Sequence, residues 1–231
     1  MSRREAANTR PRSLKGDRFT ALGQFGMDLE YYVASPADTP RHTVRYGLRP
    51  SAADVPRFSE YQDLLQLTLP GDGSYYVALF PRGADEKVPT FASSPDGRVI
   101  TIRSEWGTDY AFLSQEPTTA EIADFSFQGT AASIRNRDSD LVLALGGRGT
   151  VAATGKSLAL TAPFGASLRV GPAALTIDMP ADHPAGEIVV AAPGAWKLRE
   201  GRGVTLAKEP AGIYRLGIPA GKTAVELVKA N

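Results

Sequence analysis

Residues 141–170 of the chain read LVLALGGRGTVAATGKSLALTAPFGASLRV. Short runs of leucine, valine, alanine and threonine follow one another here, and Gly or Pro closes each run within a few residues. Apolar and polar side chains alternate with a period of two in Ser157–Thr161, which is typical of a strand with one buried face. The stretch therefore predicts short strands separated by tight connections.

The same rhythm extends from Met27 almost to Asn231. Runs of β-branched and aromatic residues recur roughly every 8–12 residues, and no stretch shows a convincing helical period. Regular spacing of this kind is typical of layered antiparallel sheets. We predict an all-β protein whose main body is a large antiparallel two-layer β-sandwich.

The clearest hairpin candidate joins Leu64–Leu69 to Tyr75–Phe80, because the residues between them, Pro70–Ser74, are dense in turn formers. Val99–Arg103 and Asp109–Ser114 follow as two further strands. Both faces of these strands are rather apolar, as expected for a sheet that is covered on both sides. We expect the four segments to form one antiparallel meander.

Composition divides the chain into three parts. Residues 1–18 are rich in arginine and poor in apolar anchors, so we expect a disordered basic tail there. Residues 19–179 hold the predicted β-sandwich. The segment Met179–Gly186, with its two prolines, breaks the strand pattern. We expect residues 180–231 to form a small C-terminal β-sheet of their own.

The overall composition excludes several classes of function. The 231-residue chain has a formal net charge of +1, which provides no general attraction for nucleic acid. It contains no cysteine, so disulfides and thiolate metal sites are excluded. No apolar run approaches the roughly 20 residues that span a bilayer, and the N-terminus lacks the apolar core of a secretory signal. We therefore expect neither nucleic acid nor a membrane as a partner.

No catalytic or metal-binding constellation stands out in the sequence. The only two histidines, His42 and His183, have no partner at a ligand-like spacing, so an exposed loop position is expected for each. There is no G-x-S-x-G nucleophile elbow. Gly146–Gly149 resembles a phosphate loop, but it joins two β-runs and opens no helix, so we expect a hairpin turn. We predict no catalytic residue, no metal and no cofactor.

One segment has the chemistry of a sugar-binding surface. Trp106 and Tyr110 offer rings that stack on the C–H face of a sugar, and Asp109 can bond its hydroxyls. Arginines in or beside neighbouring expected strands supply positive charge: Arg82, Arg98 and Arg103. The alternative is that Trp106 and Phe112 pack between the sheets while Asp109 satisfies a turn. The substrate-binding candidates are therefore Trp106, Asp109, Tyr110, Arg82 and Arg103.

These segments also carry a family resemblance. Leu64–Arg82 (LLQLTLPGDGSYYVALFPR) and Asp96–Ser114 (DGRVITIRSEWGTDYAFLS) resemble the β-sandwich of heparinase II/III-like polysaccharide lyases. Gly212–Val228 (GIYRLGIPAGKTAVELV) is similar to the small closing sheet of that family, and Gly23–Pro36 is a looser match. The resemblance covers most of residues 20–231, and its motifs are structural.

The resemblance implies β-elimination on a uronate-containing polysaccharide, held between a helical α/α-toroid and the β-sandwich, in a periplasmic or extracellular parent protein. This chain has neither a helical array nor the H-x-H-x-D motif of the family, so no catalytic residue can be carried over. We expect a β-sandwich portion that is inactive without its toroid, which is then its main partner. Two alternatives are a non-catalytic carbohydrate-binding module and a structural or assembly module with exposed strand edges.

Overall fold

The computed structural model describes residues 12–22, 26–34, 40–48, 60–68, 75–138, 140–200 and 202–230. Most of these residues lie in antiparallel strands, and the only helical segments among them are short 3-10 turns, so the prediction of an all-β fold is confirmed. Two compact units divide the chain, Met1–Pro81 and Arg82–Asn231. No helix in the described ranges is long and apolar enough to cross a bilayer.

The first unit contains two small sheets. Their strands are β1 (Arg12–Ser13), β2 (Arg18–Ala21), β3 (Met27–Ala34), β4 (Arg41–Leu48), β5 (Glu60–Leu67) and β6 (Tyr76–Gly83), in the orders β1-β4-β5 and β2-β3-β6.

A buried carboxylate anchors β2 on β3. Glu30 is fully buried and accepts a hydrogen bond of 2.9 Å from the Thr20 hydroxyl, and the Arg18 guanidinium lies 4.0 Å from the same oxygen. Arg12, Ser13 and Arg18 of the predicted disordered tail lie in strands β1 and β2, so the prediction is wrong for them. Residues 1–11 of the predicted tail lie outside the described residues.

The predicted hairpin between Leu64–Leu69 and Tyr75–Phe80 is wrong. Strand β5 pairs along its whole length with β4, from Arg41 opposite Leu67 to Leu48 opposite Glu60, whereas β6 belongs to the other small sheet. The cause is non-local: β4 pairs with β5 along its full length. The prolines on either side of β4 gave no sign in the sequence that a strand of this length lies there. The predicted four-stranded meander therefore reduces to its last two members.

The second unit contains a fourteen-stranded antiparallel sheet. Its strands are β7 (Thr90–Ser93), β8 (Val99–Ser104), β9 (Gly107–Ile122), β10 (Phe125–Arg137), β11 (Asp140–Leu145), β12 (Gly149–Ala153), β13 (Leu158–Ala162), β14 (Ala166–Val170), β15 (Ala174–Asp178), β16 (Gly186–Ala191), β17 (Trp196–Glu200), β18 (Thr205–Glu209), β19 (Ile213–Ile218) and β20 (Ala224–Lys229). Short 3-10 turns lie at Thr154–Lys156 (η2) and Pro210–Gly212 (η3).

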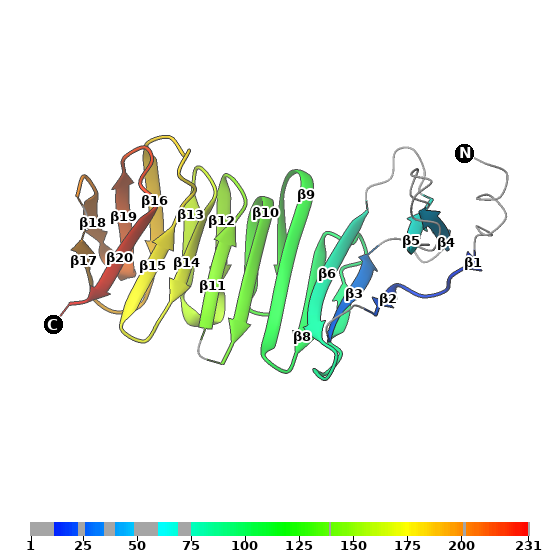
Figure 1. The fold of residues 1–231 in the computed structure, drawn as a ribbon. Helices are drawn as coiled ribbons and strands as arrows, with labels where there is room; N and C mark the ends of the chain where they lie inside the picture. The colour runs from blue at the N-terminus through cyan, green and yellow to red at the C-terminus, as the bar shows by residue number, and fades with distance from the viewer. Residues whose placement is uncertain are drawn as a thin grey trace. The chain divides into compact units, whose positions relative to one another are not determined.

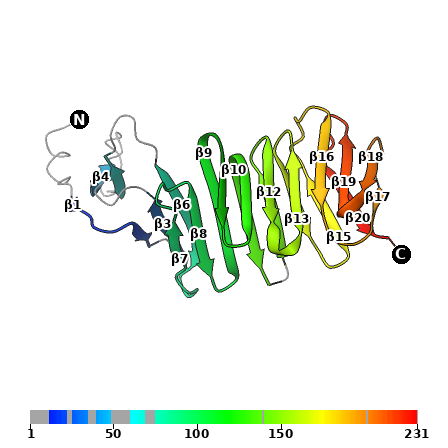
Figure 2. The same cartoon turned by 180° about the vertical axis from the view of Figure 1, so that it is seen from behind.

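The sheet divides into two layers at β10. The first half of β10 pairs with β12 and the second half with β11, so β11 and β12 are two halves of one long strand bent between them. One layer continues as β11-β14-β15-β20-β17 and the other as β12-β13-β16-β19-β18. Figures 1 and 2 show these strands from opposite sides. The predicted two-layer antiparallel sandwich is this folded sheet.

Alternating burial shows how the layers close on each other. Leu143, Leu168 and Ile177 of one layer have no exposed surface, and neither do Leu160 and Val190 of the other. All of them belong to a single apolar core. Because successive side chains of a strand point to opposite faces, the intervening residues form the outer surfaces of the sandwich.

The chain crosses between layers at a series of neighbouring bends that we call the fold line: residues 129–131, 146–148, 163–165, 179–185 and 219–223. Glycines there allow close backbone contact. A Cβ at Gly129, whose φ is +145°, would lie 2.8 Å from the Arg148 carbonyl oxygen, and a Cβ at Gly149 would overlap that of Gln128. The residues 146–148 predicted to form a hairpin turn instead form such a bend, because β11 and β12 pair with β10 and not with each other.

The last strands join the same sandwich. Strand β16 pairs with β13 and β20 pairs with β15, and Leu216 and Leu227 lie in the common core. Residues 180–231 therefore form no sheet of their own, and the break at Met179–Gly186 is another bend of the fold line. The small sheets of this protein lie in the first unit.

Replacing Gly149 with Ala should lower the free energy of unfolding by about 1–3 kcal/mol, because the new methyl group meets backbone that must shift. Gly147→Ala is the matched control, since nothing lies within 4 Å of its added Cβ. Urea unfolding of both variants measures the difference. Equal stability of the two would show that close packing at the bend is not required.

Candidate functional site

The β8–β9 hairpin places Trp106 at the surface of the second unit. Ser104 pairs with Gly107, so Glu105 and Trp106 form a two-residue turn, and the Trp106 amide donates to the Ser104 hydroxyl at 3.2 Å. The Trp106 side chain is 54% exposed. Gly107 has φ +132°, and a Cβ there would lie 2.5 Å from the Asn136 carbonyl oxygen. The turn is therefore packed closely on β10.

A row of polar residues crosses the sheet one position from this turn. Thr90, Arg103, Thr108 and Asn136 are successive register partners on β7, β8, β9 and β10. Register partners share a face of the sheet, at a strand spacing of about 4.8 Å. The Lys156 ammonium donates to the Asn136 side-chain oxygen at 3.4 Å. We call these residues, Thr90, Arg103, Thr108 and Asn136, the polar row.

Arg103 is the cation of the polar row. It is exposed, and its guanidinium forms no ion pair or hydrogen bond with the residues that the structure describes. The other arginine of this hairpin region is different, because the Arg98 Nε lies 3.6 Å from the Asp96 carboxylate. An anionic group that binds Arg103 would therefore displace no partner that belongs to the described residues.

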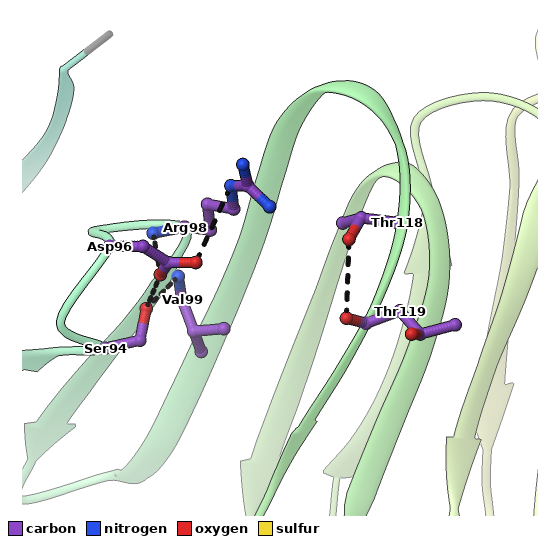
Figure 3. A network of polar contacts seen from close by, with 6 residues as sticks. All are labelled: Ser94, Asp96, Arg98, Val99, Thr118 and Thr119. Atoms are coloured by element: carbon purple, nitrogen blue, oxygen red, sulfur yellow. Dashed lines mark hydrogen bonds and ion pairs between the residues drawn. The ribbon is translucent and has the colours of Figure 1, made fainter.

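The turn before β8 is fixed by side-chain hydrogen bonds (Figure 3). The Ser94 hydroxyl donates to Asp96 Oδ1 at 2.6 Å, and the Arg98 backbone amide donates to the same atom at 3.1 Å. The Val99 amide in turn donates to the Ser94 hydroxyl oxygen at 3.0 Å. The hydrogen bond from Ser94, with help from the amide and charge of Arg98, lowers the pKa of Asp96 below its ordinary value.

Tyr110 is a core residue. It is 9% exposed, and its ring lies 5.0 Å from that of Phe125 between centroids, at a tilt of 47°. Phe112 is also buried, as the packing alternative expected, but Trp106 is not. The structure therefore places Trp106 and Arg103 on one hairpin and buries Tyr110 in the core, where a ligand cannot reach it.

Asp109 has a partner within the sheet. Its Oδ2 lies 2.7 Å from Arg137 Nη2 on the face opposite to Tyr110, so it satisfies no turn. Asp109 Oδ1 and Arg137 Nε are buried without a partner among the described residues. They are the other two atoms of the same carboxylate–guanidinium fork, and a small rotation would make the pair bidentate.

Arg82 is enclosed by its own chain. It is 7% exposed, and its Nη1 lies 2.9 Å from the Gly83 carbonyl oxygen and 3.4 Å from that of Ala84. The guanidinium therefore fixes the segment after β6 and is not presented with Trp106.

The sequence predicted an exposed loop position for each histidine, and for both this prediction is wrong. His42 lies within β4 and is partly buried, and His183 is 5% exposed in the bend of residues 179–185. Across the described ranges, no group of three or more histidine and carboxylate side chains is arranged to hold a metal ion.

Sequence reasoning missed most of the polar row. Thr108 lies two residues from the core residue Tyr110, so period-two alternation alone puts it on the same face. Thr90 and Asn136 join the row only through strand register, and Lys156 reaches it from η2 in the other layer. Register between distant strands leaves no local signal in a single sequence.

No protein-family model matches this sequence, and no curated protein matches it significantly. The similarity to the lyase β-sandwich therefore stays a prediction, and the case for a function rests on the geometry of the hairpin.

Asp96→Asn tests the turn before β8. The partners of Asp96 favour its charged carboxylate, so Asp96 stabilises the fold at pH values above the pKa of aspartate in the unfolded chain, about 3.9. This contribution is lost as the pH falls through the lower pKa that Asp96 has in the folded state. The melting temperatures of the parent protein and Asp96→Asn should therefore differ most near pH 6 and converge towards pH 3. A difference that does not change with pH would contradict this assignment.

Tyr110→Ala should lower the free energy of unfolding by about 3–5 kcal/mol, because it removes a packed ring from the core. Trp106→Ala should stay within about 0.5 kcal/mol of the parent protein, because the ring is largely in solvent. Urea unfolding compares the two. Similar losses would mean that Trp106 is also part of the core.

Proposed function

We propose that this chain is the non-catalytic β-sandwich part of a heparinase II/III-like polysaccharide lyase, whose β8–β9 hairpin contacts a uronate-containing polysaccharide. One observation carries the proposal: the β8–β9 hairpin holds the exposed Trp106 in its turn and, three residues earlier, Arg103, which has no ion pair among the described residues. An exposed aromatic ring and a guanidinium on the same hairpin match the two chemistries of a uronate, an apolar ring face and a carboxylate.

The polar row extends this match across several strands. Threonine hydroxyls donate and accept hydrogen bonds, as sugar hydroxyls do, and the Asn136 amide can do both. Neighbouring members of the polar row are separated by about 4.8 Å. An extended chain of sugars that lies across the strands would therefore contact each member of the row in turn. Trp106 would then stack at the margin of the row. This arrangement favours a linear polymer over a single sugar.

The chemistry of β-elimination explains why the hairpin alone would not cleave its ligand. A base must remove the proton beside the carboxylate, and a cation must neutralise that carboxylate. Arg103 can provide the second function. The one described tyrosine of the hairpin is buried, and both ring nitrogens of His183 lie on backbone carbonyls. We propose that an α/α-toroid domain supplies the base.

A stand-alone carbohydrate-binding module is the second candidate. The observation that favours it is that Trp106, the polar row and Lys156 all lie in the unit Arg82–Asn231, so glycan contact needs no second domain. The two candidates differ in whether an α/α-toroid joins this sandwich. An assembly role has less support, because the terminal strands β17 and β18 carry Lys197, Arg199 and Lys208, which oppose edge-to-edge pairing.

Binding to heparin, alginate and chondroitin tests the contact. Trp106→Ala should weaken binding to the preferred polymer roughly tenfold, which corresponds to about 1.4 kcal/mol for one aromatic contact. Arg103→Gln should weaken it too, with a reduced dependence on salt. Arg148→Gln is the matched control, because it removes an exposed arginine of the same unit with the same change of net charge.

Four results would overturn parts of this proposal. No binding to any of the polymers, or equal loss in Arg103→Gln and Arg148→Gln, would remove the hairpin site. Formation of unsaturated uronate by the purified chain above the solvent background would show that it has its own base. If the chain binds a polymer without cleaving it, and an added toroid domain changes neither result, the stand-alone module is favoured.

A further inference from the structure

Lys156 reaches the polar row from the opposite layer. It is the last residue of the 3-10 turn η2 (Thr154–Lys156), which follows β12, and its Nζ lies 3.4 Å from the Asn136 side-chain oxygen. Lys156 is exposed and forms no ion pair with any residue that the structure describes. The polar row therefore has a second cation, at the end that lies away from Arg103.

Hydrogen bonds hold η2 against the turn between β9 and β10. The backbone amide and the hydroxyl of Thr154 both donate to the Asp124 carbonyl oxygen, at 2.8 and 3.0 Å. Ser157, which has a left-handed φ of +53°, closes η2 by donating its amide to the Thr154 carbonyl oxygen at 3.1 Å. The backbone that carries Lys156 is therefore held in place, and only its flexible side chain has to be ordered when a ligand binds.

The ammonium of Lys156 keeps hydrogen-bonding capacity for a ligand. It has three N–H groups, and the contact with Asn136 uses one of them. The nearest carboxylate to η2 is that of Asp124, whose Oδ2 would lie 3.3 Å from a Cβ built on Gly155. Asp124 and Lys156 nevertheless form no ion pair in the part of the chain that the structure describes. An acidic ligand group would therefore not have to compete with Asp124 for the ammonium.

The two cations act at different strands of the polar row. Arg103 and Asn136 are separated by Thr108, so their backbones are two strand spacings apart, about 10 Å. A single carboxylate is much smaller than this distance, whereas two acidic groups of one oligosaccharide can lie that far apart. The spacing therefore favours one acidic group on each side of Thr108.

We propose that Lys156 is a second anion-binding residue of this site, and that the ligand is an oligosaccharide with at least two acidic groups, one held by Arg103 and one by Lys156. The inference rests on the proposed function, because it takes the polar row as the surface that contacts the polymer. Lys156 donates a charge-assisted hydrogen bond to the second acidic group, and the Asn136 amide can donate to the same group. The site thereby selects a chain of sugars over a fragment with a single acidic group.

Fragments of unsulfated chondroitin test the spacing, because a disaccharide carries one uronate and a tetrasaccharide carries two. Calorimetric titration at low salt should show that the parent protein binds the tetrasaccharide about fivefold more tightly, as expected for one additional exposed ion pair. Lys156→Gln should remove most of this preference, with little effect on the disaccharide, which Trp106 and Arg103 hold. Lys156→Arg, which keeps the charge, should retain the preference.

Lys208→Gln is the matched control, because it removes an exposed lysine of β18 with the same change of net charge. Its preference for the tetrasaccharide should equal that of the parent protein. Equal effects of Lys156→Gln and Lys208→Gln would overturn the second anion-binding residue.

Two further results would overturn the inference and leave the proposed function in place, provided that Trp106→Ala still weakens binding of a polymer. One is a parent protein that binds both fragments equally or binds neither. The other is an equal loss of both fragments in Lys156→Gln, which would mean that Arg103 and Lys156 hold the same acidic group. A parent protein that binds no polymer would overturn the inference and the proposed function together.

Discussion

Close contact between backbones at the fold line is the constraint on which the second unit depends. A long strand can cross from one layer to the other only where its bend brings carbonyl oxygens against the neighbouring strand, as those of Gln128 and Arg148 come against Gly149 and Gly129. A side chain at those positions would hold the strands apart. With glycine there, the sheet folds back on itself, and its two inner faces cover each other without any helix.

This arrangement also explains why the candidate site is firmly held. Strand β10 belongs to both layers, and the β8–β9 hairpin rests on it through Gly107. The polar row ends on β10 at Asn136, where Lys156 arrives from the other layer. If the hairpin binds a flexible polymer, as we propose, such support would leave the ordering cost to the ligand alone. Tyr110 and Phe112 contribute by filling the core beneath the hairpin.

The sequence predicted what depends on neighbouring residues and missed what depends on register. Alternation in Ser157–Thr161 identified a strand that the structure contains as β13, because one buried face leaves a period of two. The same glycines that suggest a hairpin at Gly146–Gly149 serve equally well in a bend, and only the pairing of β11 and β12 with β10 distinguishes the two. Trp106 was a correct candidate for exposure, whereas Tyr110, Asp109 and Arg82 found partners that lie far away in sequence or in their own backbone.

The order of the last strands has a consequence for synthesis. In the described part of the chain, β17 pairs only with β20 and β18 only with β19, although both partners come later in the sequence. The strands from β8 to β16 can each pair as they leave the ribosome, since each has a partner that precedes it in the chain. Residues 196–209 cannot, and they must wait for residues 213–229. The edge strands β17 and β18 are thus synthesised before the strands on which they pair. Their apolar residues Leu198 and Leu206 stay exposed until residues 213–229 have been made.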